Sequence, residues 1–139
     1  MGDYRPLPSV HAGARGVKGD HFRRLDETVV AEVAAVPTLW CPNPEATSCL
    51  RVRGSSMNPL IMDGDIVVVD SSQRDLHKLN GKIVVAWHRT TGLSLSRLVV
   101  MNGVQLLQSE NREYKPVAIE RDSSWRIIGK VLWWIRKSP

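Results

Sequence analysis

The sequence predicts a mainly β domain, and three observations lead to that prediction. Short apolar runs of strand length follow one another along the chain, and Ile66–Asp70 is the clearest of them. Tight-turn dipeptides separate these runs at Asp63-Gly64, Asn80-Gly81 and Asn102-Gly103. The apolar residues are chiefly Val, Ile and Leu, because aromatic residues make up only 6% of the 139 residues. We therefore expect a compact sheet whose strands are mostly antiparallel.

The individual elements follow from the same patterns. Glycines and prolines interrupt residues 1–19, which predicts an irregular segment. Residues 22–40 fit either a strand or a short helix that ends at Pro37, and the periodicity does not choose between them. A turn-rich stretch at 41–48 precedes a strand that contains Leu50 and Val52. Further strands are expected at residues 66–70, 82–88, 93–100, 104–108, 117–119 and 125–135.

The last of these strands contains the pair Trp133 and Trp134. Adjacent residues of a strand point to opposite faces of the sheet, so we expect one indole inside and one outside. The outward indole is a candidate for a contact between subunits, and simple packing against the sheet edge is the alternative.

Composition and charge limit the class of protein. No apolar run approaches the ~20 residues of a membrane-spanning helix, and no signal peptide is evident, so we expect a cytoplasmic protein without a membrane partner. The formal net charge of +5 is compatible with nucleic-acid binding, and a solvated basic surface explains it equally well. Cys41 and Cys49 lack the spacing of a zinc site. We therefore expect two idle thiols, with no metal and no cofactor.

Residues 51–70 form the most informative stretch of the chain. An alternating run enters Gly54-Ser55-Ser56-Met57, and the β-branched run Ile66–Asp70 follows soon after. A glycine loosens the corner between two strands and lets a serine hydroxyl project out of the sheet. This arrangement predicts a functional serine at the corner.

The corner resembles the active-site serine motif of the LexA-type self-cleaving peptidases, the family of LexA, phage CI-like repressors and UmuD. The likeness runs over residues 7–135. Four further stretches resemble that family in the same order along the chain: Asp-Gly-Asp with its following strand at 63–70, Asn-Gly with its strand at 80–86, Leu-Leu-Gln-Ser-Glu-Asn and Tyr-Lys-Pro within 106–116, and Ile-Ile-Gly-Lys-Val at 127–131. The resemblance implies a compact β domain of LexA and signal-peptidase type at 20–139, preceded by a short helical or irregular segment, and a homodimer.

The resemblance also implies roles for particular residues. Ser56 takes the place of the nucleophile, and the corner is supported by Gly54, Met57, Asp65 and Arg97. The family cuts itself at a pair of small residues before the catalytic domain, and the pair Ala12-Gly13 stands in the matching place within 1–19. A flexible linker that merely contains this pair is the alternative interpretation.

The resemblance leaves the serine without its base. In this family a lysine, kept neutral by apolar surroundings, removes the proton of the serine hydroxyl. The family's Thr-Val-Lys-Arg-Leu segment matches residues 94–98 here, and Ser96, 40 residues after Ser56, stands in the lysine's position. A serine is no base near neutral pH, and Arg97 stays protonated. We therefore expect self-cleavage to be absent or impaired.

The function expected from the resemblance is a C-terminal dimerisation and regulatory domain of a LexA- or CI-like transcriptional regulator. No two consecutive amphipathic helices form a helix-turn-helix in the sequence, so we expect DNA contact only through such a domain outside this chain. A RecA-type co-protease in the SOS response to DNA damage is the further partner that the resemblance implies.

Three rival interpretations stay open. In one, Ser56 remains an active autoproteolytic serine that uses Lys78, Lys82 or His88 as its base. In another, the chain is a UmuD-like accessory subunit of an error-prone polymerase. A signal-peptidase function is the third, and the absence of a membrane anchor speaks against it.

Overall fold

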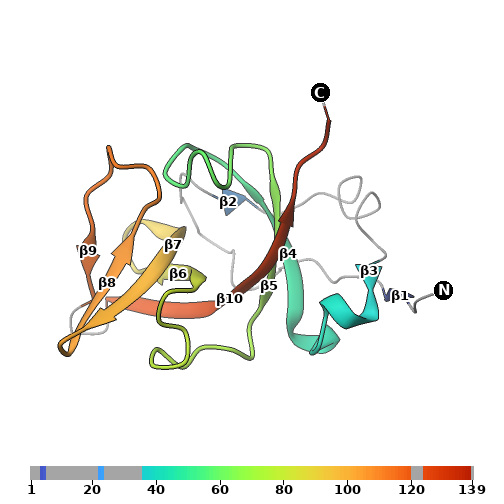
Figure 1. Ribbon diagram of the computed structural model, residues 1–139, viewed down its shortest axis with the longest axis horizontal. Coiled ribbons are helices and arrows are strands. Elements are labelled where there is room, and N and C mark those ends of the chain that lie inside the picture. The colour runs from blue at the N-terminus through green and yellow to red at the C-terminus, as the bar shows by residue number, and fades with distance from the viewer. Residues whose placement is uncertain (1–3, 6–21, 24–35, 120–123, 139) are drawn as a thin grey trace.

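The computed structural model describes residues 4–5, 22–23, 36–119 and 124–138. Nearly all regular structure in them is antiparallel strand, which confirms the predicted mainly β class (Figure 1). No helix among these residues is long and apolar enough to cross a membrane. The elements are β1 (Tyr4–Arg5), β2 (Phe22–Arg23), β3 (Val36–Pro37), the 3₁₀ helices η2 (Thr38–Trp40) and η3 (Pro44–Ala46), β4 (Thr47–Val52), β5 (Ile66–Asp70), β6 (Ile83–His88), β7 (Gly92–Met101), β8 (Val104–Gln108), β9 (Val117–Ala118) and β10 (Trp125–Ile135).

One sheet contains most of the strands and curls back on itself. Its strand order is β2-β4-β5-β10-β6-β7-β8-β9, and β2 at its edge also contacts β7. The long strand β10 runs across the molecule and pairs with β5 near its C-terminal end and with β6 near its start (Figure 1). Strands β2, β4, β5, β6 and β7 therefore surround a common interior, and β10 is the strand shared by both halves of this sheet.

The core lies on both faces of this sheet. The first cluster is the interior of the curl, and the other two clusters lie on the opposite face, because neighbouring residues of a strand alternate between them. The interior cluster consists of Leu50, Val52, Met57, Ile61, Val67, Val69, Ile83, Val85, Leu93, Leu95 and Val131. The two outer clusters consist of Cys41, Cys49, Ile66 and Val68, and of Leu79, Val84, Ala86, Leu98, Leu107 and Ile127.

Two segments begin differently from the sequence-based expectation. Strand β4 starts at Thr47, inside the stretch expected to be turn, because Thr47 is buried and pairs with Asp70 while its hydroxyl donates to Asn43 O at 2.7 Å. The expected irregular segment 1–19 contains the short strand Tyr4–Arg5, which pairs with Val36–Pro37. The remainder of 1–19 and residues 24–35 lie outside the described residues.

The two tryptophans near the end of β10 lie on opposite faces, as the alternation predicts. Trp134 packs against the interior cluster, and Trp133 packs against the cluster around Cys49. The Trp133 ring lies edge-on to Trp40 at a centroid separation of 5.3 Å, and its Nε1 donates to Trp40 O at 3.2 Å. Both indoles stay partly exposed.

A glycine makes the close contact between β10 and β5 possible. A Cβ placed on Gly129 would lie 2.6 Å from Asp70 O and 2.8 Å from Val69 Cγ1, so only glycine fits at this crossing without movement of the backbone. The pairing of β10 with β6 shifts register between Ile127 and Gly129. This irregularity lets one strand serve both halves of the sheet.

Candidate functional site

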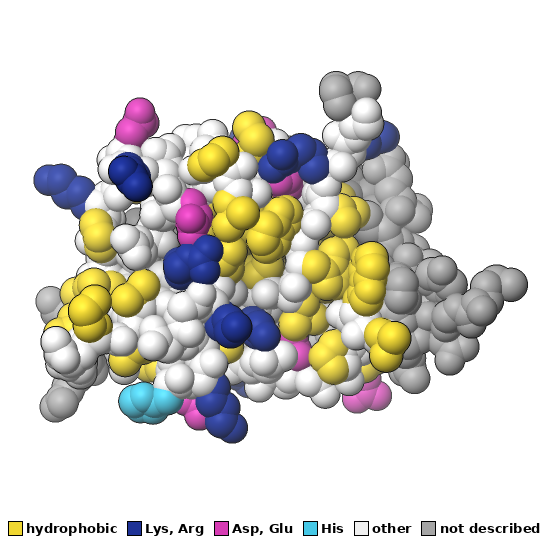
Figure 2. Space-filling model, in the orientation of Figure 1, with side chains coloured by type: hydrophobic (Ala, Val, Ile, Leu, Met, Phe, Trp, Pro, Cys, Tyr) yellow, Lys and Arg dark blue, Asp and Glu magenta, His cyan; other side chains and the backbone are white. Residues whose placement is uncertain are grey.

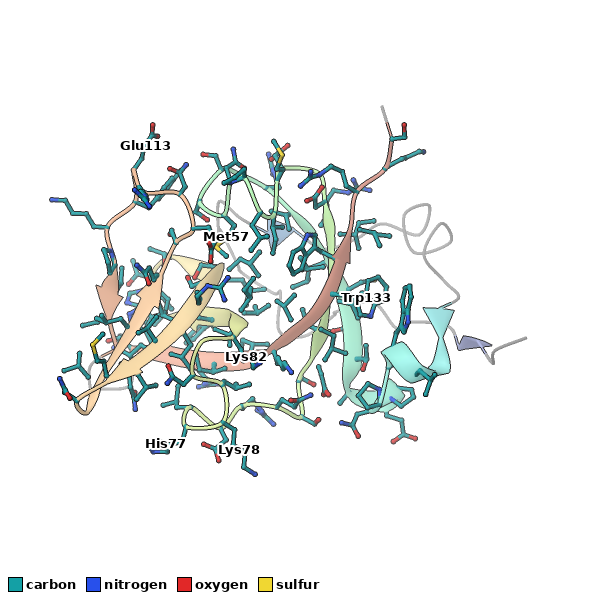
Figure 3. All side chains as sticks on the ribbon, in the orientation of Figure 1. Met57, His77, Lys78, Lys82, Glu113 and Trp133 are labelled. Carbon is teal, nitrogen blue, oxygen red and sulfur yellow. The ribbon has the colours of Figure 1, made fainter. Side chains whose placement is uncertain are left out.

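Ser56 lies in the turn region that connects β4 to β5. The chain leaves β4 at Val52 and turns at Gly54, whose φ of +93° lies in the left-handed region that favours glycine. Ser56 follows with only 3% of its surface exposed. The next residue, Met57, is buried in the interior cluster, so the corner is anchored to the core immediately beside the serine. Figure 3 shows Met57 in the upper part of the view, beside β7.

The Asp-Gly-Asp turn holds this corner from one side. Asp63 Oδ1 accepts a hydrogen bond from the main-chain N–H of Gly54 at 2.8 Å. The N–H of Gly64 donates to Val52 O, and the N–H of Val52 donates to Asp65 O, both at 2.8 Å. The turn 63–65 thus fixes both the end of β4 and the glycine that begins the corner.

Asp65 itself is a buried carboxylate with three donors. Its side chain is 1% exposed, and Oδ2 accepts from the main-chain N–H of Met62 at 2.8 Å. Arg136 donates from Nε to Oδ1 and from Nη2 to Oδ2, each at 2.8 Å. This two-pronged geometry is the strongest form of a guanidinium–carboxylate contact.

The segment after β8 holds the corner from the other side. The main-chain N–H of Asn111 donates to Ser56 O at 2.9 Å, and its Nδ2 donates to Ser55 O at 2.9 Å. The hydroxyls of Ser55 and Tyr114 lie 3.2 Å apart. Two consecutive carbonyl groups of the serine corner are therefore fixed by one asparagine.

Ser96 lies on β7, where it pairs with Val84 of β6 and is 7% exposed. Its neighbour Leu95 belongs to the same interior cluster as Met57, the neighbour of Ser56. The side chain of Ser96 points to the opposite face from Leu95, because successive residues of a strand alternate. The structure thus places the neighbours of the two serines in one cluster.

Arg97 links β7 to the corner. Its Nε donates to Glu110 Oε1 at 2.5 Å, and its Nη1 donates to Gly81 O at 2.7 Å. Glu110 directly precedes Asn111, the residue that binds the carbonyl group of Ser56. Consecutive residues therefore contact Arg97 on the strand of Ser96 and the carbonyl group of Ser56.

His88, the first of the three candidate bases, lies at a hairpin turn. His88 pairs with Gly92 at the end of the β6–β7 hairpin, four residues along β7 from Ser96, which is about 13 Å of strand. Its Nδ1 accepts hydrogen bonds from the N–H groups of Thr90 and Thr91 at 3.1 and 3.4 Å. Its ring centroid lies 4.6 Å from that of Trp125. His88 is thus committed to the hairpin turn.

The two lysines considered as substitutes are both exposed. Lys78 lies at the lower edge of the view in Figure 3, on the other side of the molecule from Met57. Lys82 begins the approach to β6, and its carbonyl accepts from the N–H of Leu98 at 2.9 Å. Because both side chains are exposed, neither lysine has the apolar surroundings that a neutral base needs.

Two further points concern the predicted cleavage site and metal binding. Ala12 and Gly13 fall among the residues that are not described. Within the described part of the chain, no group of three His, Cys, Asp or Glu side chains is arranged to hold a metal ion.

Sequence reasoning missed the roles of Asp63, Glu110 and Asn111. These residues stood in the matched stretches 63–70 and 106–116, which was the available signal, but the pattern gave no partners for them. Their partners are Gly54, Arg97 and Ser55, which lie 9, 13 and 56 residues away along the chain.

Comparison with known proteins gives consistent matches. The family profile described as Peptidase S24-like matches residues 9–132. The LexA repressor of Bordetella pertussis is 32% identical over 131 residues, which cover 94% of this chain and 55% of that protein. The LexA repressor of Aliivibrio salmonicida is 36% identical over 81 residues, which cover 58% of this chain and 37% of that protein. The HTH-type transcriptional regulator PrtR of Pseudomonas aeruginosa is 34% identical over 100 residues, which cover 66% of this chain and 37% of that protein. The chain thus spans about half or less of the length of these relatives.

Proposed function

This chain belongs to the Peptidase S24-like family, and we propose that it is the regulatory domain of a LexA-like transcriptional repressor in which self-cleavage is absent or slow. One observation carries the proposal. Ser56 is buried in a corner that is hydrogen-bonded on both sides, and Ser96 occupies the β7 position at which the family resemblance implies a lysine. The site keeps its nucleophile and its supports but has a hydroxyl where the base belongs.

The chemistry explains why such a site is slow. Attack on a peptide carbonyl requires that the Ser56 hydroxyl lose its proton, and a second hydroxyl at Ser96 does not accept that proton near neutral pH. Losing general-base assistance costs on the order of 10²–10⁴ in rate. His88 is engaged at the hairpin turn, and Lys78 and Lys82 are solvated, so these residues do not compensate.

The peptide bond to be cut would be Ala12–Gly13, which presents two small residues to a tight site. The test is incubation of the purified chain at neutral and at raised pH, followed by mass spectrometry of the products. We expect the intact chain to persist, with and without a RecA-type filament. Rapid formation of a fragment that begins at Gly13, abolished by Ser56→Ala, would show an active peptidase instead.

A homodimer is the assembly that we propose for this domain. Hydrophobic side chains lie on both sides of β10 in the space-filling view (Figure 2). Trp87, Ile128 and Trp134 are only partly buried against the interior cluster. Aromatic residues of this kind favour interfaces between subunits. Sedimentation equilibrium of the chain and of Trp134→Ala tests the idea, because a weakened dimer in the variant supports this face and an unchanged dimer removes it.

DNA recognition by the complete protein is a separate proposal. The relative from P. aeruginosa is by its name an HTH-type regulator, and this chain covers 37% of it. We propose that DNA is contacted through a helix-turn-helix unit outside these 139 residues, with the present domain joining two such units. Gel-shift assays with the isolated chain should then show only weak binding that does not depend on the DNA sequence.

A further inference from the structure

Arg136 connects the C-terminal end of the chain to the serine corner. It directly follows β10, and 49% of its side chain is exposed. Its guanidinium nevertheless places Nε and Nη2 each 2.8 Å from one of the two carboxylate oxygens of Asp65. These residues lie 71 positions apart in the sequence.

The partner of Arg136 is Asp65, which lies in the turn that hydrogen-bonds to the serine corner. Asp65 is 1% exposed, and it accepts from Met62 N–H through its side chain and from Val52 N–H through its carbonyl, both at 2.8 Å. The same turn reaches Gly54 through Asp63. Asp65 therefore contacts both ends of the segment that contains Ser56, at Met62 through its carboxylate and at Val52 through its main-chain carbonyl group.

Arg136 supplies a cation to this carboxylate, through an ion pair of 2.8 Å between Nε and Oδ1. A buried carboxylate that loses its cation is left with an uncompensated charge, and the turn around it must open to water. A lysine would keep the charge but would lose the planar fork. The contact therefore requires a guanidinium group, and it requires that the end of β10 keep its position beside Asp65.

We propose that Arg136 is a positioning residue for Ser56, which holds the turn 62–65 against the serine corner and so makes the end of β10 part of the site. It rests on the proposed function only in naming Ser56 as the reacting group. The coupling also runs in reverse, because a change that moves the residues after Ile135 pulls on Asp65 and loosens the corner.

The first test is amide hydrogen exchange of the full chain, followed by NMR. In Arg136→Ala, we expect the amides of Gly54 and Met62 to exchange at least about tenfold faster, while those of the β6–β7 ladder keep their rates. Arg136→Lys should restore part of the protection. Arg74→Ala is the control, because it removes one positive charge from an exposed side chain after β5, and it should leave all these rates unchanged.

Two outcomes would overturn the proposal. Unchanged amide exchange rates at Gly54 and Met62 in Arg136→Ala would show that the two hydrogen bonds from Arg136 to Asp65 do not hold the turn. A parallel rise at every amide, including those of β6 and β7, would show that Arg136 contributes only to global stability.

The second test uses self-cleavage in a chain that carries Ser96→Lys. Adding Arg136→Ala should lower the first-order cleavage rate about tenfold or more and leave the pH midpoint of the rate in place, since the base is untouched. An unchanged rate would contradict the positioning role. If Ser96→Lys alone does not cleave, the proposed function fails, and the exchange measurement still decides the role of Arg136.

Discussion

The main-chain N–H of Asn111 donates a 2.9 Å hydrogen bond to the carbonyl oxygen of Ser56, and its side chain donates to the carbonyl of Ser55 at the same distance. An element that follows β8 thereby fixes the backbone of a corner that follows β4. The serine is held in place from outside its own turn, and Glu110, the residue before Asn111, is bound to Arg97 on the strand of Ser96.

Asn111→Ala should loosen this corner. The variant keeps the main-chain contact with Ser56 but loses the side-chain bonds to Ser55 O and to Glu113 N–H. We expect a loss of about 1 kcal/mol in the free energy of unfolding, measured by urea denaturation. Gln108→Ala is the control, since that exposed side chain should change the stability by less than about 0.5 kcal/mol. Equal effects in the two variants would contradict the assigned role.

Asp70 should make the stability of the domain depend on pH in the acid range. Burial of its side chain works to raise the carboxyl pKa, but hydrogen bonds from Gln73, Ser72 and Asn43 outweigh it, so the pKa of Asp70 is lowered. A lowered folded-state pKa means that the contribution is fully present above the unfolded value of about 3.9 and is lost as the pH falls through the folded value.

The comparison that checks this is Asp70→Asn against the parent chain, by urea denaturation from pH 7 down to pH 3. We expect the parent to be more stable at pH 7, with the difference shrinking below about pH 4. Glu45→Gln is the matched control, because Glu45 is exposed, and its difference should stay small throughout. A difference for Asp70→Asn that grows toward low pH would have the wrong sign for this account.

The two cysteines should be unreactive in the folded protein. Both are buried and free, and burial raises the pKa of the Cys49 thiol to about 11. Burial and the nearby Asp70 also raise the pKa of Cys41. At pH 8 a thiol of pKa 11 is thiolate in only about one molecule in a thousand.

Titration with Ellman's reagent at pH 8 measures this directly. Two thiols per chain should react in guanidinium chloride, and neither should react promptly in buffer. Prompt reaction of one native thiol would show that the cluster around Cys49 is open to solvent.

The local structure was largely predictable from the sequence, because strand periodicity and turn dipeptides act over a few residues. Strand β5 lies where the apolar run Ile66–Asp70 predicts it, and Asn102 and Gly103 adopt the positive φ values that their turn requires. Strand β4 was predicted to begin too late, since the burial of Thr47 depends on its pairing with Asp70.

The contacts that build the site were not predictable in the same way. The pairs Asp65–Arg136 and Ser55–Asn111 join residues 71 and 56 positions apart. They exist because β10 crosses the sheet and the segment after β8 folds back onto the corner. No local pattern encodes such pairings. The family resemblance pointed to the stretches that contain Ser55, Asp65 and Asn111, but it ends before Arg136.

The most direct measurement of the central claim is self-cleavage of Ser96→Lys beside the parent chain. Under the proposed function, a lysine at this buried position of β7 would supply the base, so we predict cleavage at Ala12–Gly13 that is at least about 10²-fold faster than in the parent and rises with pH. Ser96→Met is the control of similar size, and Ser56→Ala in the lysine variant should abolish the reaction. Fast, Ser56-dependent cleavage by the parent chain, or no gain in a folded Ser96→Lys variant, would contradict the account.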